Sequence, residues 1–374
     1  MTTLCDLAIK YRTDKSPQIR HSYTPYYDAL LSNRPIKRIL EIGIGYPENM
    51  THVEGYKTGA SLRMWEEYFP EAQIYGLDNN PDALINEGRI KSFYCDQGDT
   101  GSLQKVVAKL GEKFDLIIDD GSHRAAHQIL SAVTLIPQLL KPDGLYIIED
   151  VLNPKDVTPY ISQYPFEIKK FNKFVDDTLI VIQNKERIPA TPEESMKQAV
   201  TTKYRLMVEE GLQWLAEQSR NRYLIVNVGS WTGASVRALA NSTRGVVISI
   251  DPWILTKEEC RSWRWPENDL EFLYKTYQES VVTFPNVVSI RSTSEAMVNI
   301  FYNKGFRFDM VFIDANHLYE PVKFDITAWR NLVCPGGLLC GHDYRDPEPG
   351  VKQAVDELVP NRKLGPDTIW YSIL

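Results

Sequence analysis

The residues Arg38-Ile-Leu-Glu-Ile-Gly-Ile-Gly45 are the strongest indication of the fold of the first half of the chain. An apolar run that ends in glycines is typical of a buried strand followed by a tight turn. Glycine has no Cβ, so the backbone at Gly43 and Gly45 can turn sharply and approach a ligand closely. Asp78 ends the next apolar run, where a carboxylate can accept hydrogen bonds from ribose hydroxyls. The stretch therefore predicts a nucleotide-binding α/β domain.

Short apolar runs alternate with segments of helical spacing along this half of the chain. The runs cover residues 73–77, 114–118, 145–148 and 178–182, and residues 61–69 have helical spacing. Such alternation is typical of a mostly parallel sheet with helices packed on its faces. We therefore expect a mostly parallel sheet, with ligands bound at the carboxyl edge of the strands.

The same signals recur in the same order in the second half of the chain. Gly43 matches Gly229, Gly59-Ala-Ser61 matches Gly233-Ala-Ser235, and Asp78 matches Asp251. Further along, Asp120-Gly-Ser-His123 matches Asp314-Ala-Asn-His317, Glu149-Asp150 matches His342-Asp343, and Asp177-Thr178 matches Asp367-Thr368. A series of matches in one order indicates an internal duplication. The expected fold class is therefore α/β, with two tandem Rossmann-like domains.

A stretch with two prolines and several charged residues separates the two series. Clusters of this composition mark linkers. We place the first domain at residues 1–186, the linker at 187–196 and the second domain at 197–374, and we expect a helix over 197–219.

The composition is that of a globular protein with room for two domains. The 374 residues are 43% hydrophobic and 24% charged, and no apolar run reaches the length of a membrane span. The N-terminal segment does not resemble a secretory signal, and the five scattered cysteines indicate reduced thiols, so we expect a cytoplasmic protein. The net charge of −7 argues against a nucleic-acid partner, and homo-oligomerisation stays open.

Acidic residues follow several of the predicted strands. Asp120, Glu149 and Asp150 would meet at one edge of the sheet, where three carboxylates repel one another unless a cation neutralises them. Oxygen ligands favour a divalent metal such as Mg²⁺ or Mn²⁺. His123, three residues after Asp120, is the candidate general base. The alternative is that Glu149-Asp150 caps a helix and that His123 lies in a surface turn.

The second half repeats this set with one substitution. Asp314, His342 and Asp343 are its candidate metal ligands, and His317 is its candidate base. Because His342 replaces a carboxylate, it can act as a ligand, as a support for another ligand or as a base.

The glycine loops do not fit a dinucleotide-binding fingerprint. Gly-x-Gly-x-x-Gly would require glycine at position 48, where the chain has Glu48, and Trp231 breaks the pattern in the second half. This counts against a nucleotide-sugar oxidoreductase. Glu-x-Gly-x-Gly with a later ribose-binding acid is instead the pattern of class I S-adenosylmethionine methyltransferases.

A set of motifs carries a more specific resemblance. In the first half they are Tyr11-Arg-Thr-Asp-Lys15, His21-Ser-Tyr-Thr24, Leu40-Glu-Ile-Gly-Ile-Gly45, Gly59-Ala-Ser-Leu-Arg-Met-Trp65, Tyr75-Gly-Leu-Asp78, Asp96-Gln97, Ile118-Asp-Asp-Gly-Ser-His123 and Ile147-Ile-Glu-Asp150. With these motifs the first half resembles the metal-dependent sugar O-methyltransferases of macrolide antibiotic pathways, notably the mycinamicin type. Phe312-Ile-Asp-Ala-Asn-His-Leu-Tyr319, Pro335-Gly-Gly337 and Gly341-His-Asp-Tyr344 are similar to a broader class I group from glycan and natural-product clusters.

The resemblance implies a set of S-adenosylmethionine-binding residues in each half. In the first half these are Thr13, Lys15, Glu41, Gly43, Gly45, Ser61, Asp78, Asp96, Gln97 and Asp119. In the second half they are Asn227, Gly229, Gly233, Ser235, Asp251 and Ser294. Two residues depart from the family pattern, because Asn227 stands where the family usually has Glu and His342 where many relatives have Asp.

We therefore expect a bifunctional O-methyltransferase that methylates hydroxyls of a sugar in a glycan, glycolipid or natural product. Insertions at residues 46–58 and 253–284 differ between the halves and would shape different acceptor pockets. One alternative is a single active phenol or catechol O-methyltransferase with a non-catalytic second domain. A nucleic-acid methyltransferase is disfavoured, because the Asn/Asp-Pro-Pro-Tyr motif is absent.

Overall fold

The computed structural model describes residues 2–185, 187–255, 270–346 and 349–374. The chain divides into two compact units, Met1–Glu186 and Arg187–Leu374. Each unit contains one seven-stranded sheet, and the last strand of each unit is antiparallel to its neighbours. The predicted fold class, two tandem Rossmann-like α/β domains, is confirmed.

The sheet of the first unit has the strand order β3-β2-β1-β4-β5-β7-β6. Its strands are β1 (Arg38–Ile42), β2 (Gln73–Asp78), β3 (Ile90–Tyr94), β4 (Phe114–Asp119), β5 (Leu140–Ile148), β6 (Phe166–Lys170) and β7 (Thr178–Gln183). The apolar runs of the sequence correspond to β1, β2, β4, β5 and β7. The two edge strands, β3 and β6, bury few side chains, so their apolar signal is weak.

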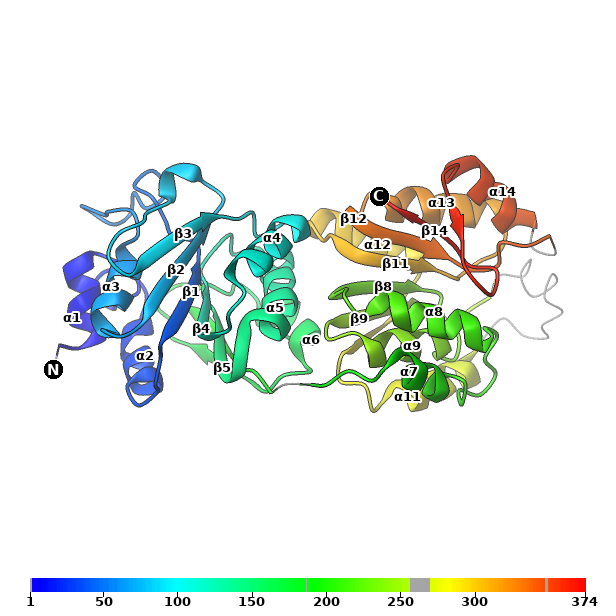
Figure 1. The fold of residues 1–374 in the computed structure, drawn as a ribbon, viewed down its shortest axis with the longest axis horizontal. Coiled ribbons are helices and arrows are strands. Elements are labelled where there is room, and N and C mark those ends of the chain that lie inside the picture. Colours follow the sequence, from blue (N-terminus) through cyan, green and yellow to red (C-terminus); the bar gives the residue numbers. More distant parts are fainter. Residues whose placement is uncertain (1, 186, 256–269, 347–348) are drawn as a thin grey trace. The chain divides into compact units, whose positions relative to one another are not determined.

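Helices cover both faces of this sheet (Figure 1). One face carries α1 (Leu4–Tyr11), α2 (Tyr23–Leu31) and α3 (Ala60–Tyr68). The other carries α4 (Thr100–Leu110), α5 (Ala125–Leu139) and α6 (Thr158–Ile161). On the first face, Tyr23, Tyr27 and Trp65 are fully buried in the core between helices and sheet. The N-terminal helices are therefore packed against the strands that lead to the candidate site.

The second unit has the same architecture, with the strand order β10-β9-β8-β11-β12-β14-β13. Its strands are β8 (Leu224–Val228), β9 (Val246–Asp251), β10 (Val287–Arg291), β11 (Phe308–Ile313), β12 (Val333–Gly341), β13 (Lys363–Leu364) and β14 (Trp370–Ile373). The helices on its two faces are α7 (Pro192–Ala199), α8 (Glu209–Ser219), α9 (Ala234–Ser242) and α11 (Glu271–Val281) on one, and α12 (Ser294–Lys304), α13 (Tyr319–Arg330) and α14 (Pro349–Leu358) on the other (Figure 1).

The segment 187–196, expected to be a linker, is partly helical. α7 begins at Pro192, because Thr191 and Glu194 form a reciprocal capping box and proline suits the first helical position. The prediction of a single helix over 197–219 is wrong, since α7 ends at Ala199 and α8 starts ten residues later, at Glu209. The capping residues were visible in the sequence, but the proline was interpreted as a linker signal.

The register of the central strands determines where the candidate site residues lie. Ile42 at the end of β1 pairs with Asp119, and Asp119 at the end of β4 pairs with Ile148. The residues that follow these three strands therefore meet at one carboxyl edge. In the second unit the ends of β8, β11 and β12 have the same register.

Three other sequence-based expectations concern features outside the sheets. In the described part of the chain, no helix is long and apolar enough to cross a membrane. Four of the five cysteines are described, and all four are free thiols. Residues 256–269 of the second insertion, with Trp263 and Trp265, lie outside the described residues. The described remainder forms α11, which buries Leu273 and Tyr277 in the core.

Candidate active sites

The glycine loops after β1 and β8 touch the loops that carry the Asp-x-x-His motifs. Gly43 has φ +88°, and a Cβ at this position would lie 2.0 Å from the carbonyl oxygen of Asp120. Gly229 has φ +85°, and its Cβ would lie 2.1 Å from the carbonyl oxygen of Asp314. Any side chain would force these loops apart, so glycine is required at both positions.

The acids that end β2 and β9 bind the glycine loops through backbone amides. Asp78 accepts hydrogen bonds from the Ile44 N–H at 2.9 Å and the Asn80 N–H at 2.8 Å. Asp251 accepts from the N–H groups of Ser230, Trp231 and Trp253 at 2.7–2.9 Å. Each acid therefore fixes its loop at the carboxyl edge of the sheet, where a ribose would approach.

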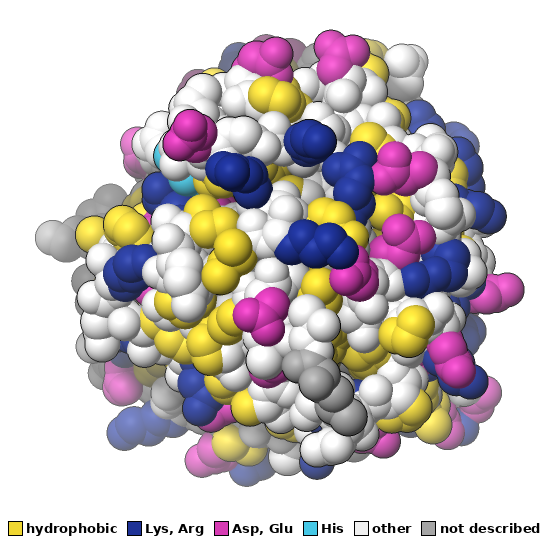
Figure 2. Space-filling model, turned by 90° about the vertical axis from the view of Figure 1, so that its left-hand side faces the viewer, with side chains coloured by type: hydrophobic (Ala, Val, Ile, Leu, Met, Phe, Trp, Pro, Cys, Tyr) yellow, Lys and Arg dark blue, Asp and Glu magenta, His cyan; other side chains and the backbone are white. Residues whose placement is uncertain are grey.

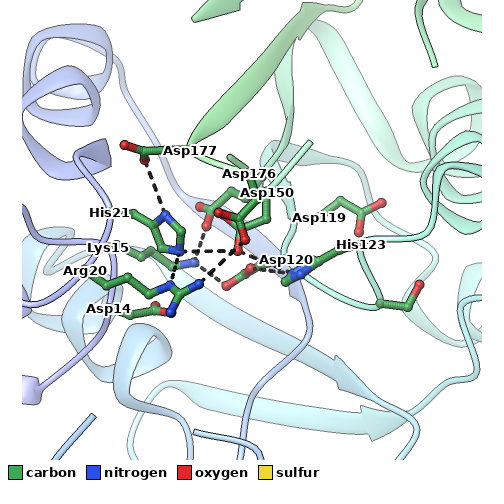
Figure 3. A network of polar contacts seen from close by, with 12 residues as sticks. Asp14, Lys15, Arg20, His21, Asp119, Asp120, His123, Asp150, Asp176 and Asp177 are labelled. Atoms are coloured by element: carbon green, nitrogen blue, oxygen red, sulfur yellow. Dashed lines mark hydrogen bonds and ion pairs between the residues drawn. The ribbon is translucent and has the colours of Figure 1, made fainter. Parts of the chain in front are cut away.

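In the first unit, Asp120, His123 and Asp150 form a compact group. One side-chain ligand atom from each lies within 4.8 Å of the others. His123 Nε2 is 3.2 Å from Asp120 Oδ1 and 3.7 Å from Asp150 Oδ2. Figure 3 shows the three side chains pointing toward one another from the loops after β4 and β5. This donor set of two carboxylates and one imidazole suits a divalent cation.

Glu149, the third predicted ligand, is not part of this group. Its carboxylate is buried and accepts hydrogen bonds from Lys15 Nζ at 2.6 Å and from the Tyr27 hydroxyl at 2.6 Å. Lys15 is 1% exposed and also lies 2.5 Å from Asp120 Oδ2 and 3.4 Å from Glu41 Oε1. Lys15 and Glu41, both predicted to bind the cofactor, thus form a buried ion cluster beneath the candidate metal position.

Burial and neighbouring charges shift several pKa values in this group. Burial lowers the pKa of His123, but the carboxylates of Asp120 and Asp150 raise it more, to about 9. Burial and the charge of Asp120 raise the pKa of Asp150 to about 6. Burial also raises the pKa of Asp120, but Lys15 and His123 lower it more, so the net shift is downward. The group therefore combines ionised carboxylates with a protonated histidine, an arrangement that a cation would change.

The second unit contains the equivalent group, Asp314, His317 and Asp343, again within 4.8 Å. His317 Nε2 is 3.1 Å from Asp343 Oδ2 and 3.9 Å from Asp314 Oδ1. His342 lies beside the group, with its Nδ1 atom 3.3 Å from Asp343 Oδ2 and 3.7 Å from Asp314 Oδ1. Burial lowers the pKa of His342, but Asp314, Asp343 and Asp367 raise it more, to about 10.

Asn227 occupies the position of Glu41 in the second unit. It is fully buried, and its amide donates to the Gly229 carbonyl at 2.8 Å and to Ser230 Oγ at 3.2 Å. Its Oδ1 atom is buried and has no hydrogen-bond partner among the described residues. A buried acceptor beside the glycine loop is suited to a donor from a ligand.

The remaining predicted cofactor residues of the first unit surround the loop. Thr13 is buried just before Lys15, Ser61 lies in the first turn of α3, and Gly45 has φ +72°. Asp96 accepts a hydrogen bond from the Gly98 N–H at 2.8 Å.

Gln97 and Asp119 form a separate polar pair. Gln97 donates to Asp119 Oδ1 at 2.5 Å, and its oxygen accepts from the Ser122 N–H at 3.0 Å. Asp119 is fully buried, accepts from the Tyr146 hydroxyl at 2.9 Å, and points away from Asp120 in Figure 3. The pair therefore supports the Asp-x-x-His loop from the side opposite to the candidate metal position.

In the second unit, Gly233 precedes α9 in a left-handed conformation and Ser235 is buried in the first turn of that helix. Ser294 begins α12, where its hydroxyl donates to Asp325 at 2.5 Å and accepts from the Trp329 indole at 2.8 Å. The Ser294 side chain is thus engaged by α13.

Two acids near the candidate sites are not among the predicted site residues. Asp177 and Asp367 each lie just before the last strand, and each is close to a histidine ring nitrogen, in His21 and His342 respectively. The repeated Asp-Thr pair before both strands was the sequence signal that could have identified them.

A cavity of about 560 Å³ lies in the first unit near the start of β7. It is lined by Leu152, Lys170, Asn172, Lys173, Phe174, Val175, Asp177 and Thr178. The loop after β5 and the β6–β7 hairpin form its walls, so it opens at the same sheet edge as Asp150. Leu152, Phe174 and Val175 give it an exposed apolar wall.

The surface of the first unit mixes charges of both signs. Figure 2 shows one face on which basic and acidic side chains are interspersed with apolar ones. Binding of a polyanion usually requires a basic surface. The expectation that nucleic acid is not a partner stays a prediction.

Two family models match the chain, both described as a methyltransferase domain. One matches residues 57–235 and the other matches residues 226–344. The chain carries two methyltransferase domains. Together the matches extend from just before α3 of domain one to the residue after Asp343 of domain two.

Similar proteins of known activity are named as sugar O-methyltransferases or antibiotic O-methyltransferases. The chain is 40% identical over 155 residues to the mycinamicin VI 2''-O-methyltransferase of Micromonospora griseorubida, covering 40% of this chain and 36% of the relative. It is 40% identical over 151 residues to the demethylmacrocin O-methyltransferase of Streptomyces fradiae, covering 40% and 36%. The chain thus spans little more than a third of the length of these relatives. The expected resemblance to macrolide-sugar O-methyltransferases is confirmed.

Solved structures of methyltransferases also resemble the chain over about half its length. The MycE methyltransferase from the mycinamycin biosynthetic pathway, in complex with Mg, SAH and mycinamycin VI, covers 49% of this chain and 54% of that chain, with 28% identity and a TM-score of 0.39. An O-methyltransferase from Bacillus cereus in complex with SAH covers 50% of this chain and 92% of that chain, with 15% identity and a TM-score of 0.35.

Proposed function

We propose that both domains are S-adenosylmethionine-dependent O-methyltransferases that act on sugar hydroxyls of a natural product, glycolipid or glycan. The observation that carries this proposal is the repeated group of two aspartates and one histidine beside a glycine loop. The sugar acceptor is supported by the names of the relatives, which include a 2''-O-methyltransferase of mycinamicin VI.

The glycine loops and the following acids are suited to hold S-adenosylmethionine. The backbone at Gly43 and Gly229 offers close approach without a Cβ, and Asp78 and Asp251 lie where ribose hydroxyls would donate. In domain two the unpaired Oδ1 of Asn227 would accept a hydrogen bond from the bound cofactor. These residues orient the methyl donor, which is the main contribution of such a domain to the reaction.

A divalent cation, Mg²⁺ or Mn²⁺, would be held by the aspartates of each group. When bound, it would lower the pKa of an acceptor hydroxyl and neutralise the carboxylates. Asp120 and Asp150 supply the charged oxygens in domain one, and Asp314 and Asp343 supply them in domain two. Glu149 would take part only if Lys15 released it.

His123 and His317 would accept the proton of the acceptor hydroxyl. The carboxylates alone keep His123 protonated, since they raise its pKa to about 9. A cation held by Asp120 and Asp150 would disfavour the imidazolium, so neutral His123 would be available to take the hydroxyl proton. With S-adenosylmethionine bound, the bond from the hydroxyl oxygen to the methyl carbon would form as the bond from that carbon to sulfur breaks, which would give S-adenosylhomocysteine as the co-product.

The cavity lined by Leu152, Phe174 and Asp177 would bind the acceptor of domain one. Its apolar wall of Leu152, Phe174 and Val175 suits the apolar face of a sugar or of the group attached to it. In domain two the corresponding β13–β14 hairpin has a shorter connection, from Leu364 to Trp370. Different hairpins would give the domains different acceptor sites, and we propose that they methylate different hydroxyls.

The experiment is a methyl-transfer assay with the full-length chain, S-adenosylmethionine and Mg²⁺ or Mn²⁺. Rhamnose-type glycosides are compared with a catechol, and mass spectrometry locates each added methyl group. We expect transfer to the glycosides, loss of transfer with a chelator, and loss of one methyl group in each of His123→Ala and Asp314→Ala. Transfer to the catechol alone would support a phenol methyltransferase. Wild-type product from Asp314→Ala and Asp343→Ala would leave domain two as a non-catalytic partner.

A further inference from the structure

In domain one, a single carboxylate oxygen lies between two imidazoles. Asp150 Oδ2 is 3.7 Å from His123 Nε2 and 3.5 Å from His21 Nε2. The second ring nitrogen of His21, Nδ1, is 3.3 Å from Asp177 Oδ1 (Figure 3). The His21 ring is buried and stacks on Tyr23, with 4.9 Å between ring centroids. His21 Nε2 also accepts a hydrogen bond from Arg20 Nε at 2.9 Å. The His21 ring therefore lies between two acids that come from different strand ends.

Domain two contains the same arrangement. Asp343 Oδ2 is 3.1 Å from His317 Nε2 and 3.3 Å from His342 Nδ1. The other nitrogen of His342, Nε2, is 3.2 Å from Asp367 Oδ2. Asp367 precedes β14 as Asp177 precedes β7.

The two bridging histidines come from different positions in their domains. His21 lies between α1 and α2, whereas His342 follows β12 directly, where domain one has Glu149. The segment before α8 in domain two, residues 200–208, contains no histidine. Copying of one sequence cannot explain an imidazole that reaches the same place from two different positions. Its presence in both domains indicates that the place itself requires an imidazole.

We propose that the pairs Asp177–His21 and Asp367–His342 are positioning elements, which hold Oδ2 of Asp150 and of Asp343 toward the candidate metal positions. His342 is then the counterpart of His21 and not a metal ligand in the position of Glu149. This inference rests on the proposed function, because it takes Asp150 and Asp343 as ligands of a cation.

The other oxygen of each aspartate has a polar neighbour of its own, through a hydrogen bond in Asp150 and an ion pair in Asp343. Asp150 Oδ1 accepts a hydrogen bond from the Tyr23 hydroxyl at 2.5 Å. Asp343 Oδ1 is 2.8 Å from a guanidinium nitrogen of Arg345. With Oδ1 engaged, the imidazole beside Oδ2 determines how the carboxylate is rotated. Groups that orient a metal ligand in this way typically contribute about tenfold to a hundredfold to metal affinity or activity.

The test measures Mn²⁺ binding to the full-length chain by electron paramagnetic resonance of the free ion. Asp314→Asn provides a background in which only the domain one group binds, and Asp120→Asn provides the reverse. His21→Gln and His342→Gln are then introduced, because glutamine keeps a hydrogen-bond donor but cannot bridge two acids. His127→Gln is the matched control, since His127 contacts Ser122 and not Asp150.

We expect His21→Gln to weaken Mn²⁺ binding about tenfold to a hundredfold in domain one only, and His342→Gln to do so in domain two only. Saturating Mn²⁺ should restore methyl transfer in both variants, and His127→Gln should bind as the wild type does. Asp177→Asn and Asp367→Asn change the acid of each pair instead of its histidine, and each should weaken Mn²⁺ binding in its own domain.

Wild-type Mn²⁺ affinity in all four of these variants would overturn the inference. So would a His342→Gln variant that stays inactive at saturating Mn²⁺, because that is the behaviour of a lost ligand or base. If Mn²⁺ binds neither the Asp314→Asn chain nor the Asp120→Asn chain when both histidines are unchanged, the proposed function fails, and the inference fails with it.

Discussion

Beneath the candidate site of domain one lies a buried lysine between three carboxylates, whereas domain two has neutral or basic residues at two of the corresponding positions. Lys15 contacts Glu41, Asp120 and Glu149, and it is 1% exposed. In domain two, Asn227 replaces Glu41 and His342 replaces Glu149. Asn227 donates its amide to the glycine loop instead of accepting from a lysine.

This difference indicates that the substitutions at Asn227 and His342 depend on each other. A buried carboxylate without a cation is strongly destabilising, and so is a buried ammonium without its carboxylates. Removing both glutamates therefore removes the need for Lys15. Taken one at a time, Asn227 and His342 each resemble the loss of a functional residue. Together they form a second, internally consistent arrangement around the same Asp-x-x-His motif and the later aspartate.

The largest effect is expected from the two histidines that both arrangements share. His123→Ala and His317→Ala remove the proposed bases, and a positioned base typically contributes about 10²–10⁴-fold in rate. Each variant should lose that factor for one methyl group and keep the other, as measured by mass spectrometry of the product over time. Equal loss of both methyl groups in either variant would mean that the domains do not act independently.

The next effect concerns stability and separates the two arrangements. Lys15→Met leaves Glu41 and Glu149 buried without their cation, so domain one should lose about 3–5 kcal/mol of stability. Hydrogen exchange of amides in β1 and β4 would measure this, with amides in β8 and β11 as the internal reference.

A triple variant provides the control for this prediction. Lys15→Met combined with Glu41→Gln and Glu149→Gln removes all three charges and should recover much of the lost stability. A triple variant as unstable as Lys15→Met alone would show that packing of the lysine chain, and not its charge, is what matters.

A smaller effect should be equal in the two domains. Gly43→Ala and Gly229→Ala each place a Cβ against a backbone carbonyl at positive φ. Strained backbone of this kind costs about 1–3 kcal/mol, so we expect cofactor affinity in the altered domain to fall about tenfold to a hundredfold. Calorimetric titration with S-adenosylhomocysteine would measure it. A loss in one domain only would show that the loops differ in function.

The smallest effect is a pH dependence confined to domain two. Burial raises the pKa of Asp325 to about 6, above its value of 3.8 when exposed. The folded state then binds the proton more tightly than the unfolded state, so stability increases as pH falls through 6. Between pH 7 and pH 5 this amounts to about 1 kcal/mol. Asp325→Asn should remove this increment from hydrogen exchange in α13, and an unchanged pH profile would contradict the assignment.

Much of the fold could be predicted because the duplication repeats each signal. Central strands are buried on both faces and give continuous apolar runs, so β1, β4 and β5 were evident. The edge strands β3 and β6 were not, since fewer than half of the side chains in each are buried. The helix α7 was missed because its proline serves equally as a linker signal and as the first residue of a helix.

The candidate site was predictable where its residues are close in sequence or follow the ends of central strands. Asp120 and His123 are three residues apart, and the strand-end position of Asp150 follows from the sheet, so this group could be expected. The hydrogen bond from Lys15 to Glu149, by contrast, joins residues 134 positions apart, so the sequence did not indicate it. The place of His21 depends in the same way on how the N-terminal segment packs against β5 and β7.

The central claim is that both domains bind the cofactor, and the most direct test is a calorimetric titration of the intact chain with S-adenosylhomocysteine in the presence of Mn²⁺. The account predicts two sites per chain. Asp78→Ala should remove one of them and Asp251→Ala the other, because each acid fixes one glycine loop. A single site, lost in Asp78→Ala and retained unchanged in Asp251→Ala, would contradict the account.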